Sequence, residues 1–129
     1  MFTIQQIKEA HSKVKSGADF PQYMQDCIAL GVISFETFVF DNHTNYFGNN
    51  NFQIASEGFS ETLSIADETK IEQFKSDLKA HQQGKTDYKT FLQDCAKSGI
   101  EKWRVLIDAL TCTYFDISGN TVLVEKIPG

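Results

Sequence analysis

Basic residues are scarce in this sequence, and arginine is nearly absent. Lysine and arginine together number 12 against 17 aspartates and glutamates, a formal net charge of −5, and Arg104 is the only arginine. A nucleic-acid footprint needs a basic surface that displaces counterions from the phosphate backbone, so this balance disfavours nucleic acid as a partner. Hydrophobic residues make up 41% of the 129 residues, which is globular composition for one domain or two very small halves.

Long hydrophobic runs and paired cysteines are also missing. The longest nearly apolar stretch, residues 27–33, is far too short to span a membrane, and residues 1–6 lack the features of a secretory signal. Three cysteines without C-x-x-C spacing indicate unpaired thiols in a reducing compartment, buried as small hydrophobic groups. They are Cys27, Cys95 and Cys112. We therefore expect a soluble cytoplasmic protein with no membrane partner.

Motifs that bind nucleotides or metals are absent from the sequence. There is no Walker loop, G-x-G-x-x-G, H-E-x-x-H or G-x-S-x-G. The stretch Gly84-Lys85-Thr86 resembles the end of a phosphate loop, but the upstream glycine and the preceding strand are missing. It is better explained as a helix end, a short loop and a helix cap. No local group of His, Cys or carboxylate residues has metal-ligand spacing, so we expect neither a cofactor nor a metal site.

The first half predicts two helices followed by three strands. Thr3 and Gln6 have the spacing of a capping box, and the helix that they begin ends at Gly17. A second helix begins near Asp19 and ends at Gly31. The strands expected next cover residues 32–40, 44–47 and 52–55.

The second half predicts the same order of elements. A helix begins at about residue 67 or 69 and ends at Gln83, and a second helix, capped by Asp87, ends at Gly99. The strands expected next cover residues 100–107, 111–116 and 120–127, with a hairpin turn at 118–120.

The two halves also resemble each other residue by residue. Placing Gln25-Asp26-Cys27 on Gln93-Asp94-Cys95 gives 7 identities over the 29 positions of residues 19–47. Chance predicts about two at average composition. With a shift one residue smaller, residues 4–8 align with 71–75. We interpret this as a duplicated helix–helix–strand–strand–strand unit.

This duplication predicts an α+β fold, with antiparallel sheet packed against helices and a pseudo-twofold axis. We expect a single domain over residues 1–129, with repeats at 3–56 and 67–127 joined by a linker at 57–66. Residues 56–64 are polar and aperiodic, which is typical of a surface loop, and we expect them to be the most mobile part of the chain. A cleft between the repeats is a natural place for a site.

The first strand of each repeat has an expected buried side and an expected wet side. On the wet sides, Ser34 and Glu36 align with Lys102 and Arg104. These opposite charges either meet across the pseudo-twofold axis or mark an asymmetric binding face, and the sequence leaves both open. The expected buried side of residues 32–40 carries Ile33, Phe35, Thr37 and Val39.

Several strings together resemble a small uncharacterised family. They are KAHQQGKTDY (79–88), GIEKW (99–103), TCTYFD (111–116) and DNHTNYFG (41–48). In this combination the chain resembles the bacterial and prophage-associated YdfO-like proteins, sometimes labelled "phage envelope protein". The resemblance implies no established activity. The envelope label fits poorly, because the sequence has no membrane span, lipidation signal or cationic amphipathic face.

The histidines are the candidates for acid–base chemistry. His11 and His81 lie on the apolar stripes of helices that are repeat partners. One hypothesis brings them together across the pseudo-twofold axis, as an acid–base pair or metal ligands. The favoured interpretation is two partly buried histidines that form local hydrogen bonds. His43 lies in a hairpin turn two residues from Asp41, whose carboxylate could orient the imidazole, although Asp-Asn is also good turn chemistry.

Two classes of function follow. The leading hypothesis is a non-enzymatic binding or regulatory module. Structural roles explain the sequence patterns, and no group of residues remains that would form a catalytic site. Its partner would be a protein or a small molecule, with surface aromatics such as Tyr46 or Tyr114 as contacts. Self-assembly into a homodimer through an exposed edge strand stays open.

The alternative is a small hydrolase or isomerase with its site in the cleft between the repeats. It would use His81 or His43 as base and Asp41 or Asp87 as the orienting group, with Tyr88 nearby.

Overall fold

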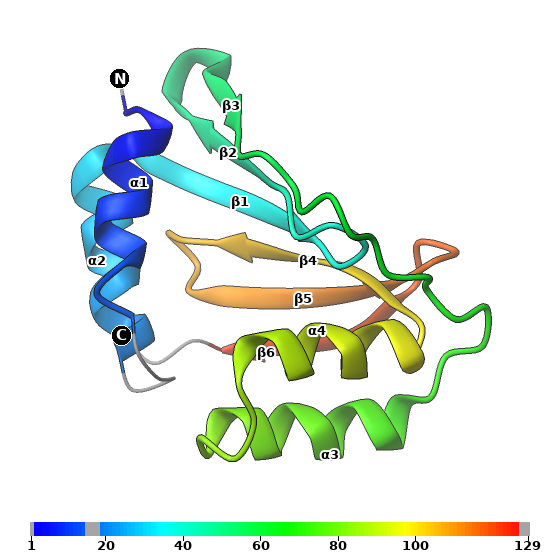
Figure 1. Cartoon of the computed structure of the whole chain (residues 1–129). Coiled ribbons are helices and arrows are strands. Elements are labelled where there is room, and N and C mark those ends of the chain that lie inside the picture. The colour runs from blue at the N-terminus through cyan, green and yellow to red at the C-terminus, as the bar shows by residue number, and fades with distance from the viewer. Residues whose placement is uncertain (1, 15–18, 127–129) are drawn as a thin grey trace.

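The computed structural model of the chain describes residues 2–14 and 19–126. Within them, four α-helices and a six-stranded antiparallel sheet form an α+β fold, which confirms the expected class (Figure 1). The helices are α1 (Ile4–His11), α2 (Phe20–Leu30), α3 (Ile71–Gln82) and α4 (Tyr88–Lys97). The strands are β1 (Val32–Phe38), β2 (Thr44–Gly48), β3 (Gln53–Ala55), β4 (Ile100–Leu106), β5 (Thr111–Asp116) and β6 (Thr121–Lys126), with a 3-10 turn, η2 (Asn49–Asn51), between β2 and β3.

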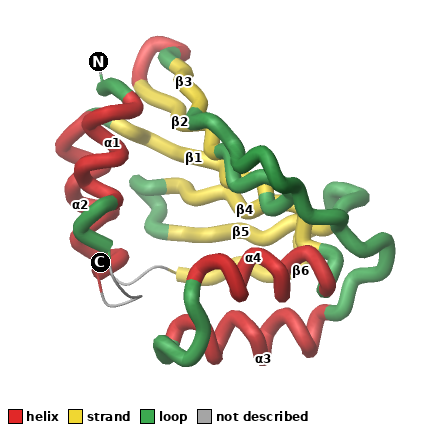
Figure 2. Tube along the Cα trace, in the orientation of Figure 1, coloured by secondary structure: helices red, strands yellow, loops and turns green. Residues whose placement is uncertain are grey.

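The helices lie in two pairs, α1 with α2 and α3 with α4, which pack on one face of the sheet (Figure 2). The strand order is β3-β2-β1-β4-β5-β6, so the first strands of the two halves meet at the centre. Ring contacts join the layers: Phe74 of α3 lies 4.9 Å from Tyr114 of β5, and Phe91 of α4 lies 5.9 Å from Trp103 of β4. The buried hydrophobic residues form one cluster that draws on both halves.

Strand pairing has the same register in both halves. Ser34 faces Phe47 across β1 and β2, and Lys102 faces Phe115 across β4 and β5, each residue 68 positions further along. The irregularity at the start of β1 recurs at the start of β4. Between the halves, Glu36 faces Arg104. The halves therefore pair as a pseudo-twofold arrangement requires, with these two charged residues at its centre.

The opposite charges of the two first strands meet on the sheet face that the helices leave uncovered. Glu36 accepts from Lys102 Nζ at 3.1 Å and from Arg104 at 3.3 Å. Both cations also lie over the ring of Phe115, at 5.5 and 5.1 Å. Of the two readings left open by the sequence, the meeting of charges is the one observed.

The ends of the elements test the local signals in the sequence. The capping box at Thr3 and Gln6 is present, with Gln6 N donating to Thr3 Oγ1 at 3.2 Å and Thr3 N to Gln6 Oε1 at 2.8 Å. Gly31 ends α2 in the left-handed conformation. The expected helix end at Gly17 lies outside the described residues.

One strand prediction is wrong at its first residue. Ile33, expected on the buried side, is 45% exposed, whereas Val32 is 3% exposed. The irregularity in β1–β2 pairing between Val32 and Ser34 shifts the alternation of side chains by one position at this end.

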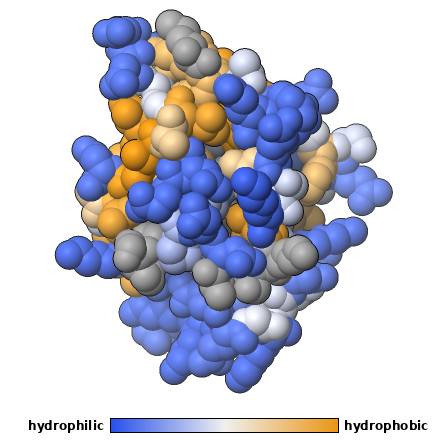
Figure 3. Space-filling view, turned by 90° about the vertical axis from the view of Figure 1, so that its left-hand side faces the viewer, coloured by the Kyte–Doolittle hydropathy of each residue, from blue (hydrophilic) through white to orange (hydrophobic). Residues whose placement is uncertain are grey.

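The space-filling view of the side that carries α1 and α2 shows an apolar area among mostly hydrophilic residues (Figure 3).

The segment between β3 and α3 has no regular structure but is attached along its length. Phe59 N donates to the carbonyl oxygen of Asp41, and Leu63 N donates to that of Phe40, both at 2.7 Å. Further on, Ala66 N donates to the carbonyl oxygen of Ala96 at 2.9 Å. The irregular path is confirmed, and its mobility stays a prediction.

The cysteines are free and buried, as expected. Burial raises the pKa of the Cys27 thiol to about 11 and that of Cys112 to about 12. Both thiols are therefore protonated near neutral pH and act as packing groups. Among the described residues, no helix has the length and apolarity that crossing a bilayer requires.

Candidate functional site

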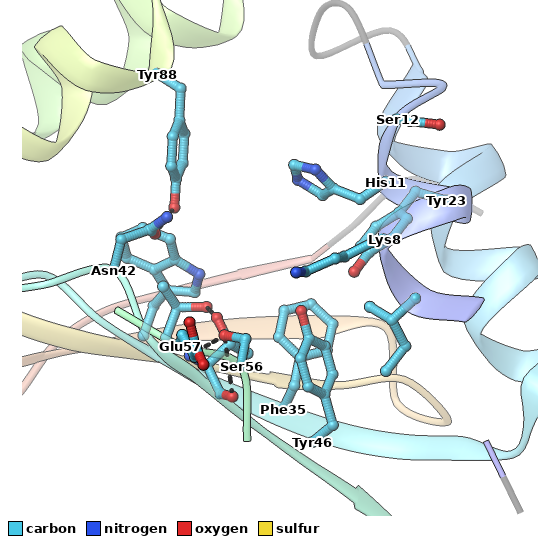
Figure 4. A pocket seen from close by; sticks show the side chains of 14 residues that line it. Lys8, His11, Ser12, Tyr23, Phe35, Asn42, Tyr46, Ser56, Glu57 and Tyr88 are labelled. Atoms are coloured by element: carbon cyan, nitrogen blue, oxygen red, sulfur yellow. Dashed lines mark hydrogen bonds between the residues drawn. The ribbon is translucent and has the colours of Figure 1, made fainter. Parts of the chain in front are cut away.

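A cleft of about 330 Å³ opens between the first helix pair and the start of α4, above the middle of the sheet (Figure 4). Its floor comes from β1, β2 and β4, one wall comes from α1 and α2, and the opposite wall comes from α4, the β1–β2 turn and the end of β3. The lining residues are Ile7, Lys8, His11, Ser12 and Tyr23 on the first wall, Asn42, Ser56, Glu57 and Tyr88 on the second, and Phe35, Thr37, Thr44, Tyr46 and Trp103 on the floor.

Aromatic rings make up most of the floor. Phe35 and Tyr46 stand opposite each other on β1 and β2, with ring centroids 5.6 Å apart. Tyr23 approaches Phe35 edge-on from α2 at 6.3 Å. Trp103, the only tryptophan of the chain, completes the floor from β4. These four rings are 3–9% exposed, and the cleft borders the part of them that stays open, where the edge or face of a ligand ring can make contact.

Hydroxyl groups lie among these rings. The Thr37 and Thr44 hydroxyls are 2.8 Å apart, and both residues are buried. Burial raises the pKa of Tyr23 far above its usual value, and it also raises that of Tyr46, where hydrogen bonds to Tyr23 and Thr44 oppose the rise. Both phenols are neutral at physiological pH. The floor therefore offers uncharged hydrogen-bonding groups and no phenolate.

The second wall is held together by a bond between distant parts of the chain. Tyr88 donates from its hydroxyl to Asn42 Oδ1 at 2.5 Å, which ties the first turn of α4 to the β1–β2 turn. Asn42 has a φ of 63°, in the left-handed region that asparagine tolerates better than most residues. Desolvation raises the pKa of Tyr88, so this hydroxyl keeps its proton.

The first wall carries two side chains that can donate hydrogen bonds, the Lys8 ammonium and the His11 imidazole. Figure 4 shows the Lys8 ammonium and the His11 ring projecting from α1 toward the middle of the cleft. His11 also meets the Tyr23 ring edge-on at 5.3 Å. Partial burial lowers the pKa of His11, so its imidazole is mainly neutral near pH 7.

Of the residues predicted for acid–base chemistry, His11 and Tyr88 line the cleft, and His43, Asp41, His81 and Asp87 do not. His43 and Asp41 do form the expected pair, with Nδ1 and Oδ1 2.5 Å apart. The imidazole stacks on Phe38 at 4.5 Å, and Phe38 lies beneath Lys102 on the uncovered sheet face. The pair therefore sits beside the cleft, and its imidazole turns toward the other face of the sheet.

His81 and Asp87 are engaged locally. The His81 ring stacks on Phe91 at 4.4 Å, and its Nδ1 lies 3.1 Å from the carbonyl oxygen of Thr86. Asp87 caps α4 by accepting from Thr90 N at 2.8 Å, and hydrogen bonds from Thr90 lower the pKa of this carboxyl. Within the described part of the chain, no contact joins His81 to His11, so the favoured local interpretation of His81 agrees with the geometry.

Two tyrosines predicted to be surface aromatics lie in the buried layer beneath the helices, and Lys8 in the cleft was not predicted. Tyr46 and Tyr114, expected as surface aromatics, are 8% and 6% exposed. They face Phe35 and Trp103 across the strands, on the side that the helices cover. Buried and partly exposed positions alternate along β2 and β5, and this alternation places the two tyrosines on the covered side. Lys8 gave no signal, because an isolated helical lysine is usually solvated.

A model of one protein family, described as a protein of unknown function (DUF1398), matches residues 8–126 of the chain. No curated protein matches it. The match covers both helix pairs and the whole sheet except for the first residues of α1. The chain therefore belongs to the DUF1398 family of proteins of unknown function.

Proposed function

We propose that this protein is a cytoplasmic, non-enzymatic binding module that takes a small organic molecule with aromatic character into the cleft between its halves. The observation that carries this proposal is the aromatic floor beneath a cavity of about 330 Å³, a size at the lower end of small-molecule sites. The two walls add polar and charged groups to this apolar floor, and such groups fix the orientation of a ligand in a pocket.

The chemistry of the lining favours binding over turnover. Nucleophilic or acid–base catalysis needs a reactive group, a base within hydrogen-bond reach and a group that orients the base. Among the lining residues, His11 is the one imidazole, and no carboxylate is in contact with it. The His43–Asp41 pair has the orienting contact but does not line the cavity.

We further propose that the two halves arose by duplication of one unit, in a prophage-associated protein. The shared registers of β1–β2 and β4–β5 support the duplication. So do the left-handed residues Asn42 and Leu110, which occupy matched turns 68 positions apart. A leucine in this conformation is unusual, and an inherited turn explains it. The prophage association rests on the sequence resemblance alone.

Nuclear magnetic resonance on isotope-labelled protein tests the binding proposal. The indole N–H of Trp103 gives a single resolved reporter in the floor, so a library of small aromatic molecules can be screened for shifts of this signal. We expect hits whose other shifts map to α1, β1 and β2. Ile7→Phe, which fills the wall, should remove these shifts, whereas Val124→Phe on the exposed strand β6 should leave them. The proposal is contradicted if no molecule in the library shifts the Trp103 signal, or if the shifts are unchanged in the Ile7→Phe variant.

A small hydrolase or isomerase is the second candidate function, and the contact between His43 and Asp41 favours it. The pair would act as base and orienting group at the edge of the cleft, next to Asn42. Hydrolysis of p-nitrophenyl acetate above the buffer rate, lost in His43→Asn and kept in His81→Asn, would establish it. Equal hydrolysis rates in the unmodified protein, His43→Asn and His81→Asn would contradict this second candidate function.

A further inference from the structure

We infer, on the basis of the proposed function, that the cleft is built for a one- or two-ring aromatic monoanion such as an aryl carboxylate. The ring would lie on the Phe35, Tyr46 and Trp103 floor, and the anionic group would lie against Lys8 and His11. This arrangement assigns the ligand an orientation as well as a chemical class.

Lys8 is exposed at the cleft, unlike its counterpart in the second half, which forms an ion pair. At the matched position in the second half, Lys75 pairs with Glu72 at 3.9 Å. The residue that aligns with Glu72 in the first half is Gln5, which is neutral. Among the described residues, no carboxylate lies within ion-pair distance of Lys8. An exposed cation at the mouth of an aromatic cleft leaves room for an anionic group from a ligand.

His11 adds a second donor to the same wall. Residues 8 and 11 lie one turn apart on α1, so their side chains project from one face of the helix. In Figure 4 both reach toward the middle of the cleft. The imidazole donates an N–H whether it is neutral or charged. Both groups also offset the partial negative charge at the carboxyl end of α1, which is a structural role distinct from ligand binding.

The opposite wall limits the charge of the ligand. Glu57 lines the cavity there, and the chain as a whole carries a net charge of −5. A molecule with several negative charges, such as a nucleotide, would place one of them near Glu57. A single anionic group at the Lys8 end avoids this repulsion. Glu57 and the amide nitrogen of Asn42, whose oxygen is taken by Tyr88, are available to a hydroxyl at the far end of the ring.

The test compares two probes that share ring and hydroxyl and differ in charge: 4-hydroxyphenylacetate and 4-hydroxyphenylacetamide. Dissociation constants come from titrations of the Trp103 indole N–H signal. We expect the carboxylate to bind about fivefold more tightly than the amide, an advantage that shrinks with added salt. Lys8→Gln should abolish the difference, and Lys13→Gln, an exposed lysine outside the cleft, should preserve it.

Each outcome decides between the proposals. Equal affinities for the two probes in the unmodified protein, or an advantage that survives Lys8→Gln, overturn the monoanion inference while a cleft that binds aromatic molecules stands. Absence of binding by either probe also overturns the inference, and the broader aromatic screen then decides separately whether the cleft binds anything. A purely structural role for Lys8 would change the stability of the variant without changing the ratio of the two affinities.

Discussion

The two helix pairs meet the sheet in the same way, but the matched inward positions carry different chemistry. In the second half, Phe74 and Leu78 of α3 are 0% and 4% exposed, and Phe74 closes over Tyr114. In the first half, the residues aligned with them are Ile7, which is 2% exposed, and His11, which is exposed, and both border the cleft. We call the second half the filled half, because a buried leucine there takes the place of the exposed histidine that borders the cleft.

The floor follows the same rule. Thr37 and Thr44 in the first half align with Val105 and Cys112 in the second half. The hydroxyl pair of the first half is thus replaced by apolar groups, and all four side chains are buried. The cleft therefore depends on a small set of polar and smaller side chains placed on a shared framework. Substitutions that exchange the two halves test this comparison.

The largest expected effect concerns the filled half. Phe74→Ala removes a fully buried ring from its contact with Tyr114 and should lower the free energy of unfolding by about 4 kcal/mol. Ile7→Ala should cost about 2 kcal/mol, because this side chain is also buried, at 2% exposure, but is smaller than the Phe74 ring. Urea unfolding followed by Trp103 fluorescence measures both. Equal losses would show that the two positions are packed alike.

The glycines that end α2 and α4 give the next contrast. Gly31 and Gly99 both have a positive φ, 95° and 81°, so alanine is strained at either site. A Cβ at Gly31 would meet nothing within 4 Å, but at Gly99 it would lie 2.6 Å from the carbonyl oxygen of Glu68. We expect Gly31→Ala to cost about 1 kcal/mol and Gly99→Ala about 3 kcal/mol. Thermal or urea unfolding that ranks them in the opposite order would contradict the attachment of the linker at Glu68.

A smaller effect is expected from the hydroxyl pair. Thr37→Val removes one partner of the Thr44 hydroxyl, which also bonds to Tyr46, and should cost about 1 kcal/mol. Thr44→Cys should have a similar cost. The double variant reproduces the apolar pair of the second half and should cost less than the sum of the two single changes. A double-mutant cycle in urea measures this, and strict additivity would mean that the two hydroxyls do not interact.

The smallest expected effect is a pH dependence that the filled half does not share. Burial lowers the pKa of His11 below its ordinary 6.5, so the unfolded chain holds this proton more tightly than the folded chain. The contribution of His11 is therefore fully present above about pH 6.5 and is lost as the pH falls below that value. His11→Leu, which copies Leu78, should show a shallower rise of the free energy of unfolding between about pH 5 and 7. Identical pH profiles would contradict the desolvation of the His11 imidazole.

Much of the fold could be predicted from the sequence because its signals are local. The Thr3 capping box and the glycine at position 31 mark helix ends through contacts with residues a few positions away. The bulge that exposes Ile33 could not be predicted in this way, because it depends on the pairing of β1 with β2. The path of the linker at 57–66 could not be predicted from local signals either, because its hydrogen bonds join residues far away in the sequence.

The candidate site could be predicted only in part. Tyr88 was found because it sits in a recognisable string, but its partner Asn42 comes from a turn 46 residues earlier. The His43–Asp41 pair was visible as a two-residue spacing, yet spacing does not say which face of the sheet the imidazole takes. Lys8 becomes significant only when α1 is placed beside the aromatic floor.

The location of a bound aromatic probe tests the central claim most directly. Intermolecular nuclear Overhauser effects between 4-hydroxyphenylacetate and labelled protein report which side chains lie within a few ångströms of the probe. We predict effects from its ring protons to the Ile7 methyl groups and to the rings of Phe35 and Trp103. Effects confined to Phe47 and Phe115 on the uncovered sheet face, or to Phe74 in the filled half, would contradict the assignment of the first-half cleft as the binding site.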